Sequence, residues 1–232
     1  MSPSRPGSAA RVTAVLLVLG ALAYTAWVVE VVVRTGLDPV RTYVSELAAT
    51  DQPLGALFRA TDLAAGLILL AAAVTALRST RRLPTTTRRP LVLLGWLALG
   101  LFGAATAADS RLPLSCAPTV DPACAAREDS GLVPATHAAH SVSSGLALAG
   151  ALAAMVALTL AARRYRIWPP LAGTGAVLVV VELAATAWTL AAVAAFEAGV
   201  GLWWLGAGQR IQLLLVALWL GVLAVSVARE RP

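Results

Sequence analysis

Six long apolar segments restrict what this sequence can fold into. They run approximately over residues 12–33, 54–77, 91–108, 138–162, 171–195 and 208–228. About 20 apolar residues in a helix cross a hydrocarbon layer of ~30 Å, so each segment suffices for one crossing. Because 59% of the residues are hydrophobic and only 13% are charged, the sequence predicts an all-α integral membrane protein. We expect a six-transmembrane-helix bundle that forms a single membrane domain over residues 1–232.

The arginine residues predict how these helices are oriented. Cytoplasmic loops carry an excess of basic residues, and one side of the predicted bundle holds most of the arginines. We therefore expect a multi-pass protein of the cell membrane with both termini in the cytoplasm. Because the arginines lie in short clusters between apolar segments, the net charge of +6 is not interpreted as nucleic-acid binding. The clustered arginines are Arg5, Arg11, Arg78, Arg81, Arg82, Arg88, Arg89, Arg163, Arg164, Arg166, Arg229 and Arg231.

Cys116 and Cys124 are the only cysteines, and both lie in the predicted outer loop between the third and fourth segments. Disulfides persist outside the cytoplasm, so we expect these two residues to be bridged. The alternative is a zinc site that also includes His137 and His140. Its gaps of seven and two residues fall outside the usual zinc-finger spacing.

His137 and His140 are the only histidines, and they lie close to the start of the fourth segment. Pro134 suits the first position of a helix. In such a helix, His137, His140, Ser141 and Ser144 form one polar stripe, which is unfavourable against lipid. The stripe is interpreted as a functional site. The alternative, for Ser144 and the neighbouring Ser143, is helix packing through small hydroxylated residues.

Other ionisable residues fall at the same outer depth. Each charge inside a membrane costs about 2.5–3.5 kcal/mol on insertion scales, so these residues need partners or water. These residues are interpreted equally well as a set of internal salt bridges or as parts of a functional site. The residues are Glu30, Arg59, Asp62, Asp109 and Arg210.

Glu182 lies near the middle of the fifth segment, on one stripe with Thr186 and Thr189. It has no neighbour in the sequence that can neutralise it. We expect either a neutral acid or a carboxylate that a long arginine reaches, and either state makes Glu182 a candidate proton carrier. The alternative is a structural hydrogen bond to threonine or to the backbone.

The first outer loop contains LDPVRTYVSELAATDQP, residues 37–53. Asp38 as N-cap and Pro39 as first helical residue predict a short interfacial helix. Its Tyr43, Val44 and Leu47 are expected to enter the membrane interface, while Ser45 and Glu46 turn toward the mouth of the bundle.

Several short motifs resemble those of a bacterial six-helix membrane family, domain of unknown function 998. They are the stretch from Tyr43 to Leu47, Asp109 at the end of the third helix, a histidine that opens the fourth, and GAGQRIQLLLVALWL from Gly206. The resemblance implies six helices and an outward-facing polar cluster, without an activity. A fainter resemblance is to ceramidase-like membrane hydrolases, which hold zinc with three histidines beside an aspartate and a serine. This chain has two histidines and would need Asp109, Asp62 or Glu46 as a further ligand.

The sequence therefore leaves several functions open, including whether the protein is an enzyme. The first is a polytopic membrane protein that is surrounded by membrane lipid and handles a lipid or small molecule at an outward-facing polar site. The second is a metal-dependent membrane hydrolase, with zinc on His137, His140 and Asp109. An isoprenoid cyclase that uses Trp27, Trp96 and Trp188, and a non-enzymatic subunit, sensor or transporter, are further alternatives. The candidate catalytic residues are His137, His140, Asp109, Glu46, Asp62, Ser45, Glu182 and Arg210.

Overall fold

The computed structural model of the protein describes residues 7–81 and 89–229, which form helices and loops without a strand. Six helical spans are long and apolar enough to cross a membrane, which confirms the predicted six-helix bundle. The chain is therefore a multi-pass membrane protein. The long helices are α1 (Ser8–Tyr24), α2 (Gly55–Arg81), α3 (Pro90–Asp109), α5 (Ala135–Arg164), α6 (Pro169–Glu197) and α7 (Leu205–Ala228).

The first span differs from the predicted continuous helix. The α-helix ends at Tyr24 and is followed by a 3₁₀ helix, η1 (Ala26–Val31). The Thr25 hydroxyl lies 3.1 Å and 3.0 Å from the carbonyl oxygens of Ala21 and Leu22, and so bonds back to the preceding turn. Such back-bonding competes with the regular helical hydrogen bonds. The tighter helix that follows carries Glu30, which is buried.

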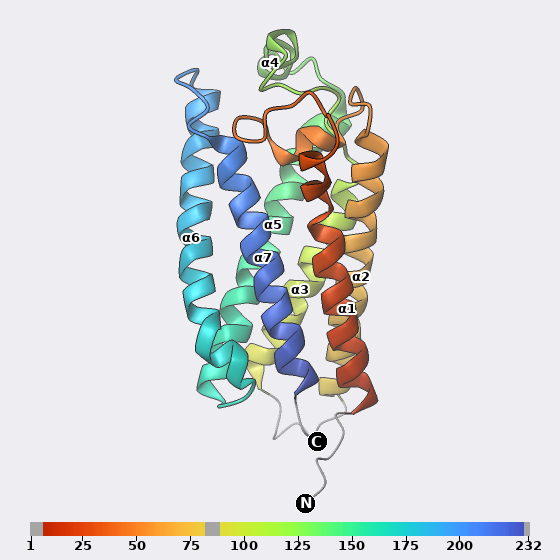
Figure 1. Ribbon diagram of the computed structural model, residues 1–232, viewed down its shortest axis with the longest axis vertical. Coiled ribbons are helices and arrows are strands. Elements are labelled where there is room, and N and C mark those ends of the chain that lie inside the picture. The colour runs from red at the N-terminus through yellow and green to blue at the C-terminus, as the bar shows by residue number, and fades with distance from the viewer. Residues whose placement is uncertain (1–6, 82–88, 230–232) are drawn as a thin grey trace, which may run out of the picture.

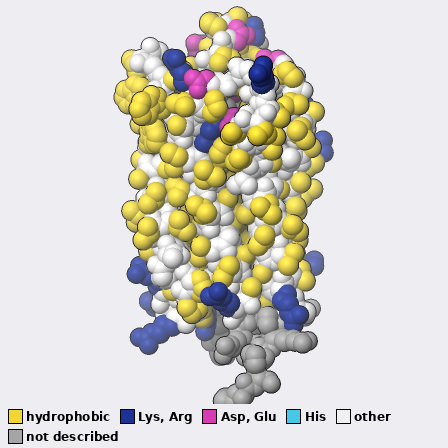
Figure 2. Space-filling model, viewed as in Figure 1, with side chains coloured by type: hydrophobic (Ala, Val, Ile, Leu, Met, Phe, Trp, Pro, Cys, Tyr) yellow, Lys and Arg dark blue, Asp and Glu magenta, His cyan; other side chains and the backbone are white. Residues whose placement is uncertain are grey.

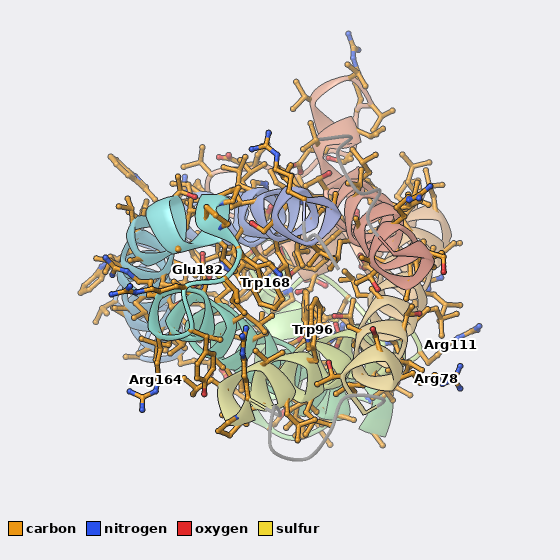
Figure 3. All side chains as sticks on the ribbon, turned by 90° about the horizontal axis from the view of Figure 1, so that it is seen from below. Arg78, Trp96, Arg111, Arg164, Trp168 and Glu182 are labelled. Carbon is orange, nitrogen blue, oxygen red and sulfur yellow. A yellow bond between two sulfur atoms is a disulfide. The ribbon has the colours of Figure 1, made fainter. Side chains whose placement is uncertain are left out.

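The long helices form a closed ring in chain order. Each one packs against its neighbours in the sequence, and α7 packs against α1. Figure 3, which looks along the bundle, shows this ring, with Trp96 and Trp168 toward its interior and Arg78 and Arg164 pointing outward. Large apolar side chains fill the interior, including Leu69, Phe102, Leu158 and Trp219.

The two ends of the bundle differ in charge. Figure 1 shows the start of α1 and the end of α7 at the lower end, which we call the terminal end, whereas the loops before α2, α5 and α7 lie at the upper end, the loop end. In Figure 2, arginine side chains surround the terminal end and also occur at the loop end, whereas acidic side chains appear only near the loop end, and an apolar band lies between the two ends. An apolar band between two polar ends is the surface expected of a protein that spans a bilayer.

Close contact between α3 and α5 sets the position of Asp109. A Cβ atom on Gly150 would lie 2.7 Å from the backbone nitrogen of Phe102, so only glycine allows the two backbones to approach this closely. The helices are antiparallel. Asp109 lies seven residues beyond Phe102 on α3, and Ser143 lies seven residues before Gly150 on α5. At 1.5 Å per residue both are about 10 Å above the contact, which brings them side by side.

Two loops fold over the loop end and are joined to each other. The short helix predicted in the first loop is a 3₁₀ helix, η2 (Val44–Ala48), which begins five residues after Pro39. Its Leu47 packs with Trp27 and Phe58 in a small apolar cluster of its own. The backbone N–H of Thr50 donates to the carbonyl oxygen of Leu114 in the α3–α5 loop, at 2.9 Å.

The α3–α5 loop contains a helix that the sequence did not indicate to us, α4 (Pro122–Asp129). Asp121 caps it by accepting a hydrogen bond from the N–H of Ala123, at 2.9 Å. Cys116 and Cys124 form a disulfide across this loop, so the predicted bridge is confirmed. The bridge joins the start of α4 to the segment that follows α3.

A buried ion pair attaches the first loop to α7. Arg210 donates from Nε and Nη2 to the two carboxylate oxygens of Glu30, at 2.6 Å and 2.7 Å, and from Nη1 to the carbonyl oxygens of Thr42 and Gly206. Both side chains of the pair are at most 9% exposed. This contact supports the interpretation of Glu30 and Arg210 as a structural salt bridge.

We predict that Glu30→Gln destabilises the protein by about 3–5 kcal/mol, because it leaves the buried guanidinium of Arg210 without its counterion. The double variant Glu30→Leu with Arg210→Met removes both charges and should unfold at a higher temperature than Glu30→Gln alone. Thermal unfolding in detergent measures both. Equal unfolding temperatures for wild type and Glu30→Gln would show that the pair does not support the fold.

Candidate functional site at the loop end

A compact polar cluster joins α3 to α5, and His140 is its centre. The His140 Nδ1 atom lies 3.1 Å from Asp109 Oδ1 and 3.2 Å from the carbonyl oxygen of Leu112. The other ring nitrogen, Nε2, lies 3.2 Å from the hydroxyl oxygen of Ser144. The Ser143 hydroxyl donates to Asp109 Oδ1. The side chains of His140 and Asp109 are 11% and 23% exposed, so the cluster reaches the surface.

These contacts determine which nitrogen of His140 carries the proton when the ring is neutral. Nδ1 faces a carboxylate and a carbonyl oxygen, and both of these can only accept. Nδ1 must therefore be the donor, which leaves a lone pair on Nε2. That lone pair faces Ser144.

The Ser144 proton has two neighbouring acceptors, His140 Nε2 and Asp109 Oδ1, the second at 3.1 Å. Asp109 Oδ1 also receives the Ser143 hydroxyl and lies 3.1 Å from His140 Nδ1. The Ser144 hydroxyl therefore has His140 Nε2 within hydrogen-bond distance as one of its two acceptors. The arrangement is a serine, a histidine and an aspartate connected in the order that activates a serine hydroxyl.

His137 has the opposite tautomer. Its Nδ1 accepts the backbone N–H of Ser115 at 3.0 Å and lies 2.8 Å from the Ser115 hydroxyl. A nitrogen that accepts an N–H cannot carry a proton, so the proton of the neutral ring is on Nε2. This atom is 3.4 Å from Glu128 Oε1 on α4, but it forms no aligned hydrogen bond there. His137 is completely buried and attaches the α3–α5 loop to α5.

The two histidines therefore belong to different groups of side chains. Within the described ranges, no three His, Cys, Asp or Glu residues converge in a way that could hold a metal ion. Cys116 and Cys124 are bonded to each other, so they are not zinc ligands. His137, His140 and Asp109 consequently do not form the predicted three-ligand group, because His137 points to Ser115 and Glu128 instead.

Glu46 forms a second connection between the loops. Its carboxylate accepts the N–H of Thr119 at 2.8 Å and the Thr119 hydroxyl at 2.5 Å. Glu46 is completely buried, and burial raises the pKa of this carboxyl to about 7, although the bonds from Thr119 oppose the rise. Ser45 lies beside it in η2 and is half-buried. The sequence placed both residues at the mouth of the bundle, where the structure has them.

The remaining candidates are separated from the His140 cluster to different degrees. Asp62 on α2 lies within electrostatic range of Asp109 and His140. Arg59, one turn earlier, donates to the carbonyl oxygen of Ala48 at 2.6 Å and so supports the first loop. Arg210 is occupied by Glu30, and Glu182 lies on α6 in the interior of the bundle (Figure 3).

The sequence placed Ser144 on the polar stripe with His140, but it indicated no chemical role for Ser144, Ser143, Ser115 or Thr119. Ser143 and Ser144 were interpreted as packing residues, although Ser144 follows His140 by four positions and therefore lies on the same helical face. That spacing was the available signal. Ser115 and Thr119 come from an irregular loop, where no periodicity relates a residue to α5 or to η2. Their positions follow from the folded loop alone.

The raised pKa of Glu46 predicts a loss of stability with rising pH. Since the pKa in the folded protein lies above the ordinary value of 4.5, the folded state holds the extra proton between about pH 4.5 and 7. The stabilisation is complete below this window and is lost as the pH rises through 7, by at most about 1.4 kcal/mol per pH unit.

The variant Glu46→Gln is neutral at every pH and should flatten this dependence when unfolding temperatures are compared from pH 5 to pH 8. The control is Asp51→Asn, an exposed acid of the same loop, which should keep the wild-type slope. If Glu46→Gln keeps the same slope as wild type, Glu46 is ionised throughout the range and the assignment fails.

Comparison with known proteins gives a family and no activity. No curated protein and no solved structure matches the chain, so the fainter resemblance to ceramidase-like hydrolases gains no support. A family model described as "Protein of unknown function (DUF998)" matches residues 5–226. This match extends over nearly all of the sequence and agrees with the resemblance found from its motifs. The chain belongs to the DUF998 family.

Proposed function

We propose that this protein binds a lipid or a lipid-soluble small molecule at the loop end and cleaves an ester or amide bond in it. Ser144 is the nucleophile, His140 is the general base and Asp109 orients the imidazole. The observation that carries the proposal is the lone pair of His140 Nε2, 3.2 Å from the Ser144 hydroxyl oxygen, on a ring whose Nδ1 faces Asp109.

The proposed chemistry follows from these contacts. As Ser144 Oγ attacks the carbonyl carbon of the substrate, its proton passes to His140 Nε2, and Asp109 stabilises the imidazolium that forms. Collapse of the tetrahedral intermediate expels the alcohol or amine, which takes the proton from Nε2–H and leaves an acyl group on Ser144. Water then attacks the acyl carbon while the same nitrogen takes its proton, and the bond to Ser144 Oγ breaks as Oγ recovers that proton, which releases the acid. Ser143 is a positioning residue, since it touches Asp109 and not the reacting atoms.

A lipid-soluble substrate is supported by the surroundings of the cluster. Val142 and Leu146, on the same part of α5, are 66% and 48% exposed, so in a bilayer these side chains lie against acyl chains. Trp203 and Trp204 at the loop end are also largely exposed, and tryptophan is enriched where a membrane meets water. The exposure of these side chains supports a position of the His140 cluster near the depth of lipid head groups.

We further propose that the loop end faces the outside of the cell membrane, so that both termini are cytoplasmic. The support is the excess of arginine at the terminal end, which the positive-inside rule assigns to the cytoplasm. The Cys116–Cys124 disulfide at the loop end agrees with an oxidising compartment.

Two alternatives receive less support. A zinc hydrolase needs three converging ligands, and the described residues do not supply such a group. For a cyclase, tryptophan faces should surround one carbocation. Trp96 instead packs against Trp168, Trp27 lies under Arg210, and the Trp188 ring donates to the carbonyl oxygen of Trp203.

A fluorophosphonate probe tests the proposed nucleophile, because an activated serine displaces its fluoride and becomes phosphonylated. We expect the probe to modify Ser144, as mapped by peptide mass spectrometry, and His140→Gln to slow the reaction by about 100-fold or more. Ser141→Ala, which removes an exposed hydroxyl of the same helix, is the matched control and should react at the wild-type rate. Unfolding temperatures identify any variant that fails to fold.

The proposal fails if Ser144 of the folded wild-type protein is not modified, or if His140→Gln reacts as fast as wild type. A sulfonated probe that cannot cross membranes tests the orientation separately. It should modify the protein in intact cells. Modification in inside-out vesicles alone would reverse the orientation without affecting the assignment of Ser144.

A further inference from the structure

Glu182 is a buried acid in the middle of α6 that the His140 site does not use. Its side chain is inaccessible to solvent, and neither carboxyl oxygen has a hydrogen-bond partner. Figure 3 places it on the inner side of α6, within the ring of helices. An ionised carboxylate at such a position costs several kcal/mol unless it is paired.

The polar neighbours of Glu182 form no aligned hydrogen bond with it. Thr186, one turn further along α6, accepts a hydrogen bond from the Gln212 amide of α7 at 2.9 Å. Both residues lie beside the carboxyl, but their bond is to each other. Thr189, on the same face, also has a buried hydroxyl without a partner.

No described cation is free to neutralise this carboxyl from the helices packed against α6. Arg210 is the only charged residue between Leu205 and Ala228 on α7, and its guanidinium is held by Glu30, Thr42 and Gly206. α5 has no ionisable residue between His140 and Arg163. The remaining titratable group near Glu182 is Tyr24 of α1, which interacts electrostatically with Glu182, Asp62 and Asp109.

We propose that Glu182 is a proton-binding site inside the membrane, and that the protein carries it as the neutral carboxylic acid at physiological pH. The unpartnered oxygens and the absence of a free cation on α5 and α7, within the part of the chain that the structure describes, carry this assignment. The proposal does not depend on the function assigned to Ser144.

Dicyclohexylcarbodiimide tests the protonation state directly, because it partitions into membranes and reacts with carboxylic acids but not with carboxylates. The acid adds across one C=N bond: its oxygen bonds to the carbon and its proton moves to the nitrogen, so the protein gains the mass of the reagent. We expect this adduct on Glu182 in the folded protein at pH 7. A water-soluble carbodiimide should not reach the site.

The matched control uses the second acid of the same helix. Glu182 and Glu197 lie on one tryptic peptide, between Arg166 and Arg210, and Glu197 is exposed at the end of α6. Glu182→Gln should abolish the adduct from the membrane-soluble reagent, whereas Glu197→Gln should keep it. Because glutamine is isosteric with the neutral acid, Glu182→Gln should also unfold within a few degrees of the wild-type temperature.

Three results would overturn the assignment. The first is a wild-type protein that forms the adduct only after unfolding. The second is protection of Glu182 by sodium ions at constant pH, which would make the site one for a metal cation. The third is a large fall in unfolding temperature for Glu182→Gln, which would indicate an ionised and paired carboxylate.

Discussion

A polar group inside a bilayer has no water to bond, so leaving it without a partner in another helix or loop costs several kcal/mol. This constraint explains the arrangement of the loop end. Arg210 binds Glu30 and two carbonyl oxygens, and Asp109 receives hydroxyl donors from α5 and lies beside the imidazole of His140. The partners come from segments far apart in the sequence. Pairing at this end therefore joins α3 to α5 and the first loop to α7, in addition to the apolar packing below.

The two loops at this end support the proposed site from above. The disulfide closes the segment that places Ser115 on His137 and Thr119 on Glu46. With His137 fixed on the loop, the helix that carries it also presents His140 and Ser144 in a defined rotation, one turn apart. Close contact between Gly150 and Phe102 fixes the height of α3 relative to α5. Rigid supports of this kind are what a reactive constellation needs to keep its geometry.

The protein also separates two kinds of buried acid. Glu30 is paired, because a guanidinium binds both of its oxygens, whereas Glu182 has no such partner and is proposed to be neutral. The two acids differ because Arg210 lies near the loop end of α7, where Glu30 and the carbonyl oxygens of Thr42 and Gly206 hold its guanidinium.

Much of the fold could be predicted from the sequence, because six apolar segments of membrane-spanning length leave few alternatives. The disulfide could also be predicted, since the two cysteines lie in one predicted outer loop and have no other cysteine to pair with. The site was predicted only in part. The spacing of His140 and Ser144 on one helical face was visible, but their relation to Asp109 depends on the Gly150–Phe102 contact, which no local pattern encodes. Helix α4 is short and polar, and the bonds of Ser115 and Thr119 arise from loop folding, so neither produced a periodic signal.

The tautomer of His140 is the most direct test of the account, because the proposed chemistry needs its proton on Nδ1 and a lone pair on Nε2. The chain contains two histidines, so ¹⁵N NMR of histidine-labelled protein gives two sets of ring signals, and His137→Asn assigns them. At a pH where both rings are neutral, His140 should be protonated on Nδ1 and His137 on Nε2. A His140 ring protonated on Nε2 would contradict the proposed role of His140 as the base for Ser144.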